Sequence, residues 1–211
     1  RMIFSGIEFT GQPPFRDVLI HATVLTKDGR RMSKSLGTGI NPLELIEKYG
    51  TDALRFGLAS QATGLQDLRF GEDLLVMGKK FANKIWNIAR YVMQKNGPDY
   101  NWSNARPQND WVAKIDAQTK EVTAQIENYS FAEAANNLYH FIWHEIADKY
   151  IEETKDKNDL ETKDTLAYLL VNSLKLLHPF MPFVTEEIWS KLPIPNKQLL
   201  LVEKWPTSLV I

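Results

Sequence analysis

A short basic segment near the N-terminus carries the residues best suited to chemistry. Arg30, Arg31 and Lys34 place three cations within five residues, and Ser33 and Ser35 flank the lysine. A lysine ammonium, hydroxyl groups and free backbone amides together suit the oxygens of a polyphosphate. Solvated basic turns share this composition, so the segment alone permits both a phosphate-binding and a purely structural interpretation.

The sequence around this segment favours the first interpretation. Residues 31–35 read Arg-Met-Ser-Lys-Ser and resemble the Lys-Met-Ser-Lys-Ser signature of the class I aminoacyl-tRNA synthetases, and the similarity continues through residues 36–43 and 49–56. The stretches most similar to the valine-specific (valyl) branch are residues 9–15, 83–87, 141–145 and 178–189. The nearest alternative is the isoleucyl branch. A helical module that binds RNA or protein without catalysis is the alternative from another class.

The resemblance implies activation of valine with ATP and Mg²⁺, followed by transfer of valine to tRNA(Val). Lys34 matches the second lysine of the signature, and the resemblance assigns it a catalytic contact with the charge that builds on the leaving pyrophosphate. The residues assigned to ATP binding are Arg31, Met32, Ser33, Lys34 and Ser35. Arg31 replaces the usual first lysine and Thr38 a common asparagine, so the geometry of the loop is less predictable.

The resemblance covers only part of such an enzyme. The family's other ATP signature, His-x-Gly-His, has no match among the four histidines. The chain also opens without a helix start signal, as a piece of a longer protein would. We therefore expect that the chain alone neither binds ATP nor forms an adenylate. No metal site is expected, because Asp148 stands where a His144-Glu145-x-x-His zinc motif requires its second histidine.

Composition limits the alternatives. The 211 residues include 44% hydrophobic and 24% charged residues, as ordinary globular proteins do, and no cysteine, which excludes disulfides and thiolate metal sites. No apolar run approaches the roughly 20 residues of a membrane helix. The expectation is a monomer in the cytoplasm. Basic residues are concentrated in residues 63–96, with 6 against 3 acidic residues, whereas residues 97–211 carry 11 against 17. A polyanion should therefore meet the first half of the chain and the helix that ends it.

Two kinds of element flank the signature segment. Residues 18–25 are apolar and β-branched, which predicts a buried strand of a parallel sheet. By resemblance this is the last strand of a nucleotide-binding domain. Asn41, Pro42 and Glu44 predict a helix start through an N-cap, a first-turn proline and a capping box. A further helix is predicted to begin after Thr51.

A long helix is predicted over residues 72–96, with one apolar stripe and one basic face. The basic side chains expected to contact tRNA phosphates are Lys79, Lys80, Lys84 and Arg90. A merely solvated basic face is the alternative. The tryptophans fall mostly beside core positions, so packing is favoured for them over stacking on nucleobases.

The remaining chain predicts an antiparallel helical bundle, with helices over residues 110–128, 131–155, 160–178 and 183–192. Residues 199–202 predict a strand. The expected fold is mainly α: a bundle of the anticodon-binding type, preceded by a remnant of an α/β nucleotide-binding domain. The expected division is residues 1–38 (end of the catalytic domain), 39–75 (stem-contact helices), 76–192 (anticodon-binding bundle) and 193–211 (start of a C-terminal part).

Overall fold

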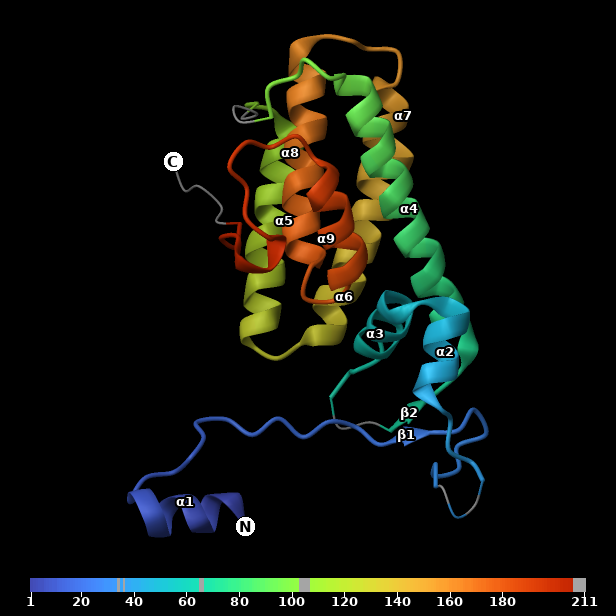
Figure 1. The fold of residues 1–211 in the computed structure, drawn as a ribbon, viewed down its shortest axis with the longest axis vertical. Helices are drawn as coiled ribbons and strands as arrows, with labels where there is room; N and C mark the ends of the chain where they lie inside the picture. The colour runs from blue at the N-terminus through green and yellow to red at the C-terminus, as the bar shows by residue number, and fades with distance from the viewer. Residues whose placement is uncertain (34, 36, 65–66, 103–106, 207–211) are drawn as a thin grey trace.

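The computed structural model describes residues 1–33, 35, 37–64, 67–102 and 107–206. Figure 1 shows an elongated molecule with a tall helical bundle at one end and an extended N-terminal arm at the other. The helices of the bundle are α4 (Glu72–Asn96), α5 (Asp110–Glu127), α6 (Phe131–His140), η1 (Phe141–Tyr150), α7 (Ile151–Thr154), α8 (Leu160–Leu177) and α9 (Pro182–Lys191). The predicted mainly helical fold and antiparallel bundle are confirmed.

The large core lies inside this bundle. Its members come from every long helix, and the fully buried ones include Phe81, Ile115, Leu138, Leu169 and Leu174. The predicted stripe on α4 is confirmed, since Phe81, Ile85, Ile88 and Val92 are buried. Side chains at spacings of three and four share one helix face, so a single stripe is sufficient to seat α4.

The helix predicted over residues 131–155 is continuous, but its middle third is a π-helix. The run consists of α6, η1 and α7, and η1 contributes ten residues of the wider form. Buried positions in η1 are spaced by five, as from Phe141 to Ile146, or by four, as from Ile146 to Tyr150. A π-helix has more residues per turn than an α-helix, which fits this spacing. π-Helical residues are rare and occur mostly as single-turn bulges inside α-helices, so a run of ten is unusual.

A second, smaller core lies below the bundle and supports the signature segment. Its buried members are Leu45, Leu68, Phe70 and Leu75, and partly buried Met32 packs against them. α2 (Pro42–Tyr49) borders this core and begins as predicted, with Asn41 accepting a hydrogen bond from the Leu43 amide at 3.1 Å. Glu44 accepts from the Asn41 side-chain amide instead of completing a backbone capping box.

The predicted strand over residues 18–25 is largely wrong. Only β1 (Val24–Leu25) forms, and it pairs in parallel with β2 (Leu68–Arg69). Val18, Leu19 and Ile20 are extended but exposed by more than half. Among the described residues β2 is the one strand beside β1, and no described strand pairs with residues 18–23. Apolar β-branched composition predicts a buried strand only where neighbouring strands exist.

α3 (Thr51–Ala59) belongs to both cores. Its Phe56 lies in the bundle core, with its ring centroid 5.1 Å from that of Phe81, whereas Leu54 and Leu58 pack against the small core. α3 approaches α4 at two glycines: a Cβ on Gly78 would meet the Ala53 carbonyl oxygen at 2.7 Å, and one on Gly57 would meet the Leu74 carbonyl oxygen at 3.2 Å. The two helices can touch this closely only because Gly78 has no side chain.

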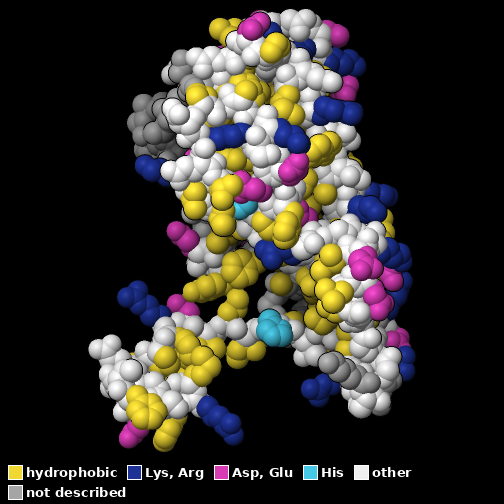
Figure 2. Space-filling model, in the orientation of Figure 1, with side chains coloured by type: hydrophobic (Ala, Val, Ile, Leu, Met, Phe, Trp, Pro, Cys, Tyr) yellow, Lys and Arg dark blue, Asp and Glu magenta, His cyan; other side chains and the backbone are white. Residues whose placement is uncertain are grey.

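α1 (Met2–Thr10) stands apart from the bundle (Figure 1), and the arm that follows it contacts the bundle where the Tyr129 hydroxyl donates to Asp17 at 3.2 Å. None of the nine residues of α1, all of which the structure describes, is buried. Phe4 and Phe9 are 79% and 85% exposed. Figure 2 shows the resulting apolar surface at the end of the arm. The sequence did not predict this helix, because its apolar residues follow no stripe and no cap marks its start.

The segment after α9 returns across the bundle. Residues 200–202, predicted as part of a strand, form the 3₁₀-helix η2 (Leu200–Val202) instead. The amides of Leu200 and Leu201 donate to the Glu186 carboxylate, and Trp205 Nε1 donates to Thr123 Oγ1 at 2.9 Å. These long-range bonds replace the strand partner that the local sequence pattern required. Among the described residues, no helix is both long and apolar enough to cross a membrane.

Candidate functional sites

The signature segment is a loop closed by Thr38. Its Oγ1 donates to the Arg31 carbonyl at 3.1 Å and accepts from the Ser33 amide at 3.0 Å, and its own amide donates to the Ser33 carbonyl at 3.2 Å. Ser33 and Ser35 share a hydrogen bond of 2.8 Å between their hydroxyl groups. Thr38 therefore holds the two ends of the loop together. Lys34, the predicted catalytic residue, lies outside the described residues.

The loop is anchored at its base and exposed at its tip. Met32 reaches into the small core, whereas the side chains of Arg31 and Ser35 are exposed. A bridge between Leu25 and Arg31 fixes the preceding turn. In that turn a hydrogen bond from Thr26 lowers the pKa of Asp28, and paired Arg30 lowers it further. Arg31, Ser33 and Ser35 thus lie on one short polar loop, which Met32 attaches to the small core.

The four basic residues predicted on α4 have different environments. Lys79 donates to the Lys48 carbonyl at 3.2 Å and so caps the end of α2. Lys84 is half-buried and pairs with Asp148 at 3.0 Å. Lys80 and Arg90 are exposed and make no hydrogen bond or ion pair within the described part of the chain. Figure 2 shows basic side chains along the edge of the molecule where α4 runs.

Aromatic side chains of α6 and η1 lie beside this basic face. Trp143 is half-buried, and Lys84 Nζ lies 5.3 Å from its ring centroid. Tyr139 packs against Trp143 at 5.3 Å between centroids, and the rings of His140 and His144 lie 5.5 Å apart. The hydrogen bond from Lys84 lowers the pKa of Asp148, and His144 adds to this effect. Cations and ring faces therefore share one surface, which we call the α4–η1 face.

The sequence predicted the basic half of the α4–η1 face but not its aromatic half. The expectation that tryptophans pack in the core holds for Trp102 and Trp189, which are 6% and 3% exposed, but Trp86 is 37% exposed. The basic half is visible in the helical spacing of the sequence, since Lys80, Lys84 and Asn87 share one side of α4. Its aromatic half comes from residues about 60 positions further along the chain, which no local pattern connects to α4.

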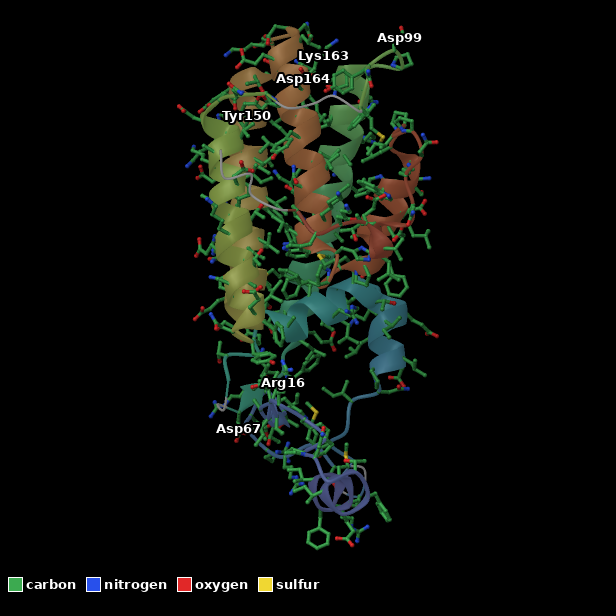
Figure 3. The ribbon with its side chains drawn as sticks, turned by 90° about the vertical axis from the view of Figure 1, so that its left-hand side faces the viewer. Arg16, Asp67, Asp99, Tyr150, Lys163 and Asp164 are labelled. Carbon is green, nitrogen blue, oxygen red and sulfur yellow. The ribbon has the colours of Figure 1, made fainter. Side chains whose placement is uncertain are left out.

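Two acidic residues and one lysine lie at the end of the bundle away from the small core. A pocket of about 500 Å³ lies there, lined by residues 96–101 together with Leu160, Lys163 and Asp164. Figure 3 shows Asp99, Lys163 and Asp164 gathered at this end, far from Arg16 and Asp67. The Tyr100 hydroxyl donates to Asp164 at 2.6 Å, and burial raises the pKa of Tyr100 above its ordinary value. The pocket is thus a structural junction and less suited to a polyanion than the α4–η1 face.

Two family models match the chain. Residues 1–71 match the model described as tRNA synthetases class I (I, L, M and V). Residues 109–210 match the model described as the anticodon-binding domain of tRNA ligase. The first match contains the signature loop and α2–α3, and the second contains every bundle helix after α4.

Curated relatives agree with these models. The chain is 43% identical to the valine–tRNA ligase of Bacillus cereus over 221 residues, with 98% of this chain and 25% of that protein covered. It is 42% identical to the corresponding ligase of Geobacillus kaustophilus, with 98% and 25% covered. The chain therefore spans about a quarter of the length of the curated relatives it matches.

A solved structure shares the fold. The LeuRS of Agrobacterium radiobacter K84, in a ternary complex with tRNA and LeuAMS, superposes with a TM-score of 0.76 at 20% sequence identity. The superposition covers 97% of this chain and 26% of that one. Taken together, the signature loop, the helical bundle and these similarities show that the chain belongs to the class I tRNA synthetases, in the valine–tRNA ligase family.

Proposed function

We propose that this chain is part of an enzyme that activates valine with ATP and joins it to tRNA(Val) in the cytoplasm. The observation that carries the proposal is the position of the signature loop on a small core that shares α3 with an anticodon-binding type of bundle. This arrangement sets a phosphate-binding loop and an RNA-binding surface on one scaffold. We assign the chain the four divisions expected from its sequence: residues 1–38, 39–75, 76–192 and 193–211.

The donors of the loop are compatible with ATP carrying Mg²⁺. The hydroxyls of Ser33 and Ser35 lie 2.8 Å apart, and Arg31 is exposed beside them. Each can contact phosphate oxygens, and Lys34 follows Ser33 directly in the sequence. As the pyrophosphate leaves, its charge grows, so a cation held near it stabilises the transition state more than the ground state. Thr38 and Met32 would hold these donors in place.

Residues 1–23 are proposed to pack against the rest of the nucleotide-binding domain. A helix that is apolar on all sides is ordinarily buried, yet Phe4 and Phe9 of α1 are among the most exposed side chains. In this proposal, residues 1–23 and the signature loop form one wall of the nucleotide site. We expect no adenylate formation by the 211-residue chain alone.

The α4–η1 face is proposed to contact the anticodon arm of the tRNA. Lys80 and Arg90 supply cations that have no partner among the described residues, and Trp143 supplies a half-buried ring beside Lys84. Base stacking on an aromatic ring is worth about 1–3 kcal/mol per base, and unpaired loop bases are open to it. Lys79 is the weakest of the four predicted phosphate contacts, because it already caps α2.

Amino acid-dependent exchange of pyrophosphate into ATP tests the proposed reaction. The full-length protein that carries this chain should catalyse exchange with valine and charge tRNA(Val), and it should prefer valine over isoleucine. The 211-residue chain should show neither activity. Exchange that depends on another amino acid, or none with the full-length protein, would contradict the proposal. A Lys34→Ala variant of the full-length protein should lose exchange but still bind tRNA(Val).

A further inference from the structure

α9 begins without a cap of its own. Its N-cap residue is Met181, whose side chain makes no capping hydrogen bond, and its first position is Pro182. The amides of Phe183 and Val184 therefore lack acceptors within the helix, as the first amides of any helix do. Both are satisfied from elsewhere in the fold: the Asp52 carboxylate accepts from Phe183 at 3.2 Å and from Val184 at 2.6 Å.

Asp52 is the second residue of α3 and is 93% shielded from solvent, with 7% of its surface exposed. A buried carboxylate is costly unless it is hydrogen-bonded, and helix N-terminal amides provide such bonds together with the positive end of the helix dipole. One turn further along α3, Arg55 Nη2 donates to the Pro179 carbonyl at 2.9 Å. α3 is thus bonded to the start of α9 through Asp52 as acceptor, and to the connection between α8 and α9 through Arg55 as donor.

The other end of α3 is also bound to the bundle. Ser60, its C-cap, is buried, and its carbonyl accepts from Asn136 Nδ2 of α6 at 3.0 Å. Along its length α3 lies against α4, where Gly78 permits close approach. Leu54 and Leu58 of the same helix pack against the small core, which also holds Met32 of the signature loop. One short helix therefore fixes the loop to the bundle.

We propose that Asp52 is a positioning residue for the transfer of the amino acid to tRNA: by capping α9 from α3, it holds the bundle at a set angle to the signature loop. This inference rests on the proposed function. A tRNA bound by the bundle must place its distant acceptor end at the nucleotide site. A small rotation at α3 becomes a large displacement at that end, and a misplacement of about 1 Å can cost ~100-fold in rate.

The test separates activation from transfer in the full-length protein. The variants are Asp52→Ala, which removes both acceptors, and Asp52→Asn, which keeps the shape but faces one amide with an NH₂ group. Glu47→Gln, on the exposed side of α2, is the matched control. Three quantities are measured: valine-dependent pyrophosphate exchange, the Kd for a tRNA(Val) transcript, and kcat for charging.

We expect Asp52→Ala to lower the kcat of charging by about 10- to 100-fold, with exchange and Kd within about threefold of wild type. The kcat of charging for Asp52→Asn should lie between those of Asp52→Ala and wild type, and Glu47→Gln should match wild type. Charging at the wild-type rate in Asp52→Ala would overturn the inference. So would a parallel loss of exchange, or a loss of tRNA binding, because either would mean that Asp52 only supports folding. Absence of valine-dependent exchange in the wild-type protein would instead reject the proposed function.

Discussion

Lys84 on α4 and Asp148 on η1 form an ion pair at 3.0 Å in the middle of the α4–η1 face. The two residues are 64 positions apart in sequence, and their pairing joins α4 to η1. It also places a carboxylate within a surface proposed to bind phosphates. Lys84 can therefore contact RNA only if it exchanges Asp148 for a phosphate, whereas Lys80 and Arg90 have no such competitor.

Asp148→Asn should strengthen RNA binding by this chain. The substitution removes a negative charge and frees Lys84, so the affinity for tRNA(Val) should rise several-fold at low salt. The slope of log Kd against log salt concentration should steepen by up to about one phosphate equivalent, or 0.9. Thermal stability should change little, because a partly exposed ion pair contributes about 0–1 kcal/mol.

Glu133→Gln is the control for that measurement, because it removes one exposed negative charge near the start of α6. Anisotropy titrations at two salt concentrations suffice. Equal gains in both variants would show that only net charge matters. An unchanged affinity in Asp148→Asn would mean that Lys84 does not contact RNA.

Gly78→Ala tests the close approach of α3 to α4. The added Cβ would meet the Ala53 carbonyl oxygen at 2.7 Å, which a backbone atom can relieve only by moving the helix. Overpacking of this kind costs about 1–3 kcal/mol, and the better helix propensity of alanine returns up to ~1 kcal/mol. Urea unfolding should therefore show net destabilisation.

Asn83→Ala, on the exposed side of the same helix, is the matched substitution and should stay within about 0.5 kcal/mol of wild type. If Gly78→Ala were as stable as Asn83→Ala, α3 would not be fixed against α4 in the way the structure shows. The link that α3 forms between the loop and the bundle would then lack one of its contacts.

His178 should make stability depend on pH. Its Nδ1 lies 2.8 Å from Thr185 Oγ1, and its buried Nε2 has no partner among the described residues. Burial lowers the pKa of His178 below 6.5, although nearby Glu186 and Asp52 partly oppose this. The unfolded chain therefore takes up a proton more readily, so stability falls as the pH drops below about 6.5 towards the folded-state pKa.

The slope of this loss is at most about 1.4 kcal/mol per pH unit for one proton. His178→Gln keeps a side chain able to bond Thr185 but cannot take up the proton. Urea unfolding at pH 7.5, 6.5 and 5.5 should show a smaller loss of stability in His178→Gln than in wild type. Parallel curves for the two proteins would show that His178 is not held neutral by burial.

Local signals explain which elements the sequence predicted. The bounds of α4 follow from one unbroken stripe and a glycine at each end, and α2 follows from Asn41 and Pro42. α1 lacks both stripe and cap. The strand over residues 18–25 did not form in full because a strand depends on partners elsewhere, and within the described residues the pairing is limited to β2 and a single bridge from Leu25 to Arg31.

The candidate sites also contain a part that local sequence predicts and a part that depends on contacts between distant residues. Arg31, Ser33 and Ser35 lie within five consecutive residues that follow a recognisable pattern, so the loop could be predicted from sequence. The closing role of Thr38 depends on a backbone path that the sequence does not specify. The Asp52 contact spans 132 residues to Val184, and the ring of Trp143 meets Lys84 across two helices. Contacts of this range become visible only in the folded chain.

Binding of the 211-residue chain to tRNA tests the central claim most directly. Fluorescence anisotropy would compare valine tRNA, isoleucine tRNA and a valine tRNA carrying an exchanged anticodon, at two salt concentrations. We predict that the chain binds valine tRNA most tightly, and that the preference is lost when the anticodon is exchanged. Equal and steeply salt-dependent binding of all three RNAs would contradict it, because only phosphate contacts would then remain in the α4–η1 face.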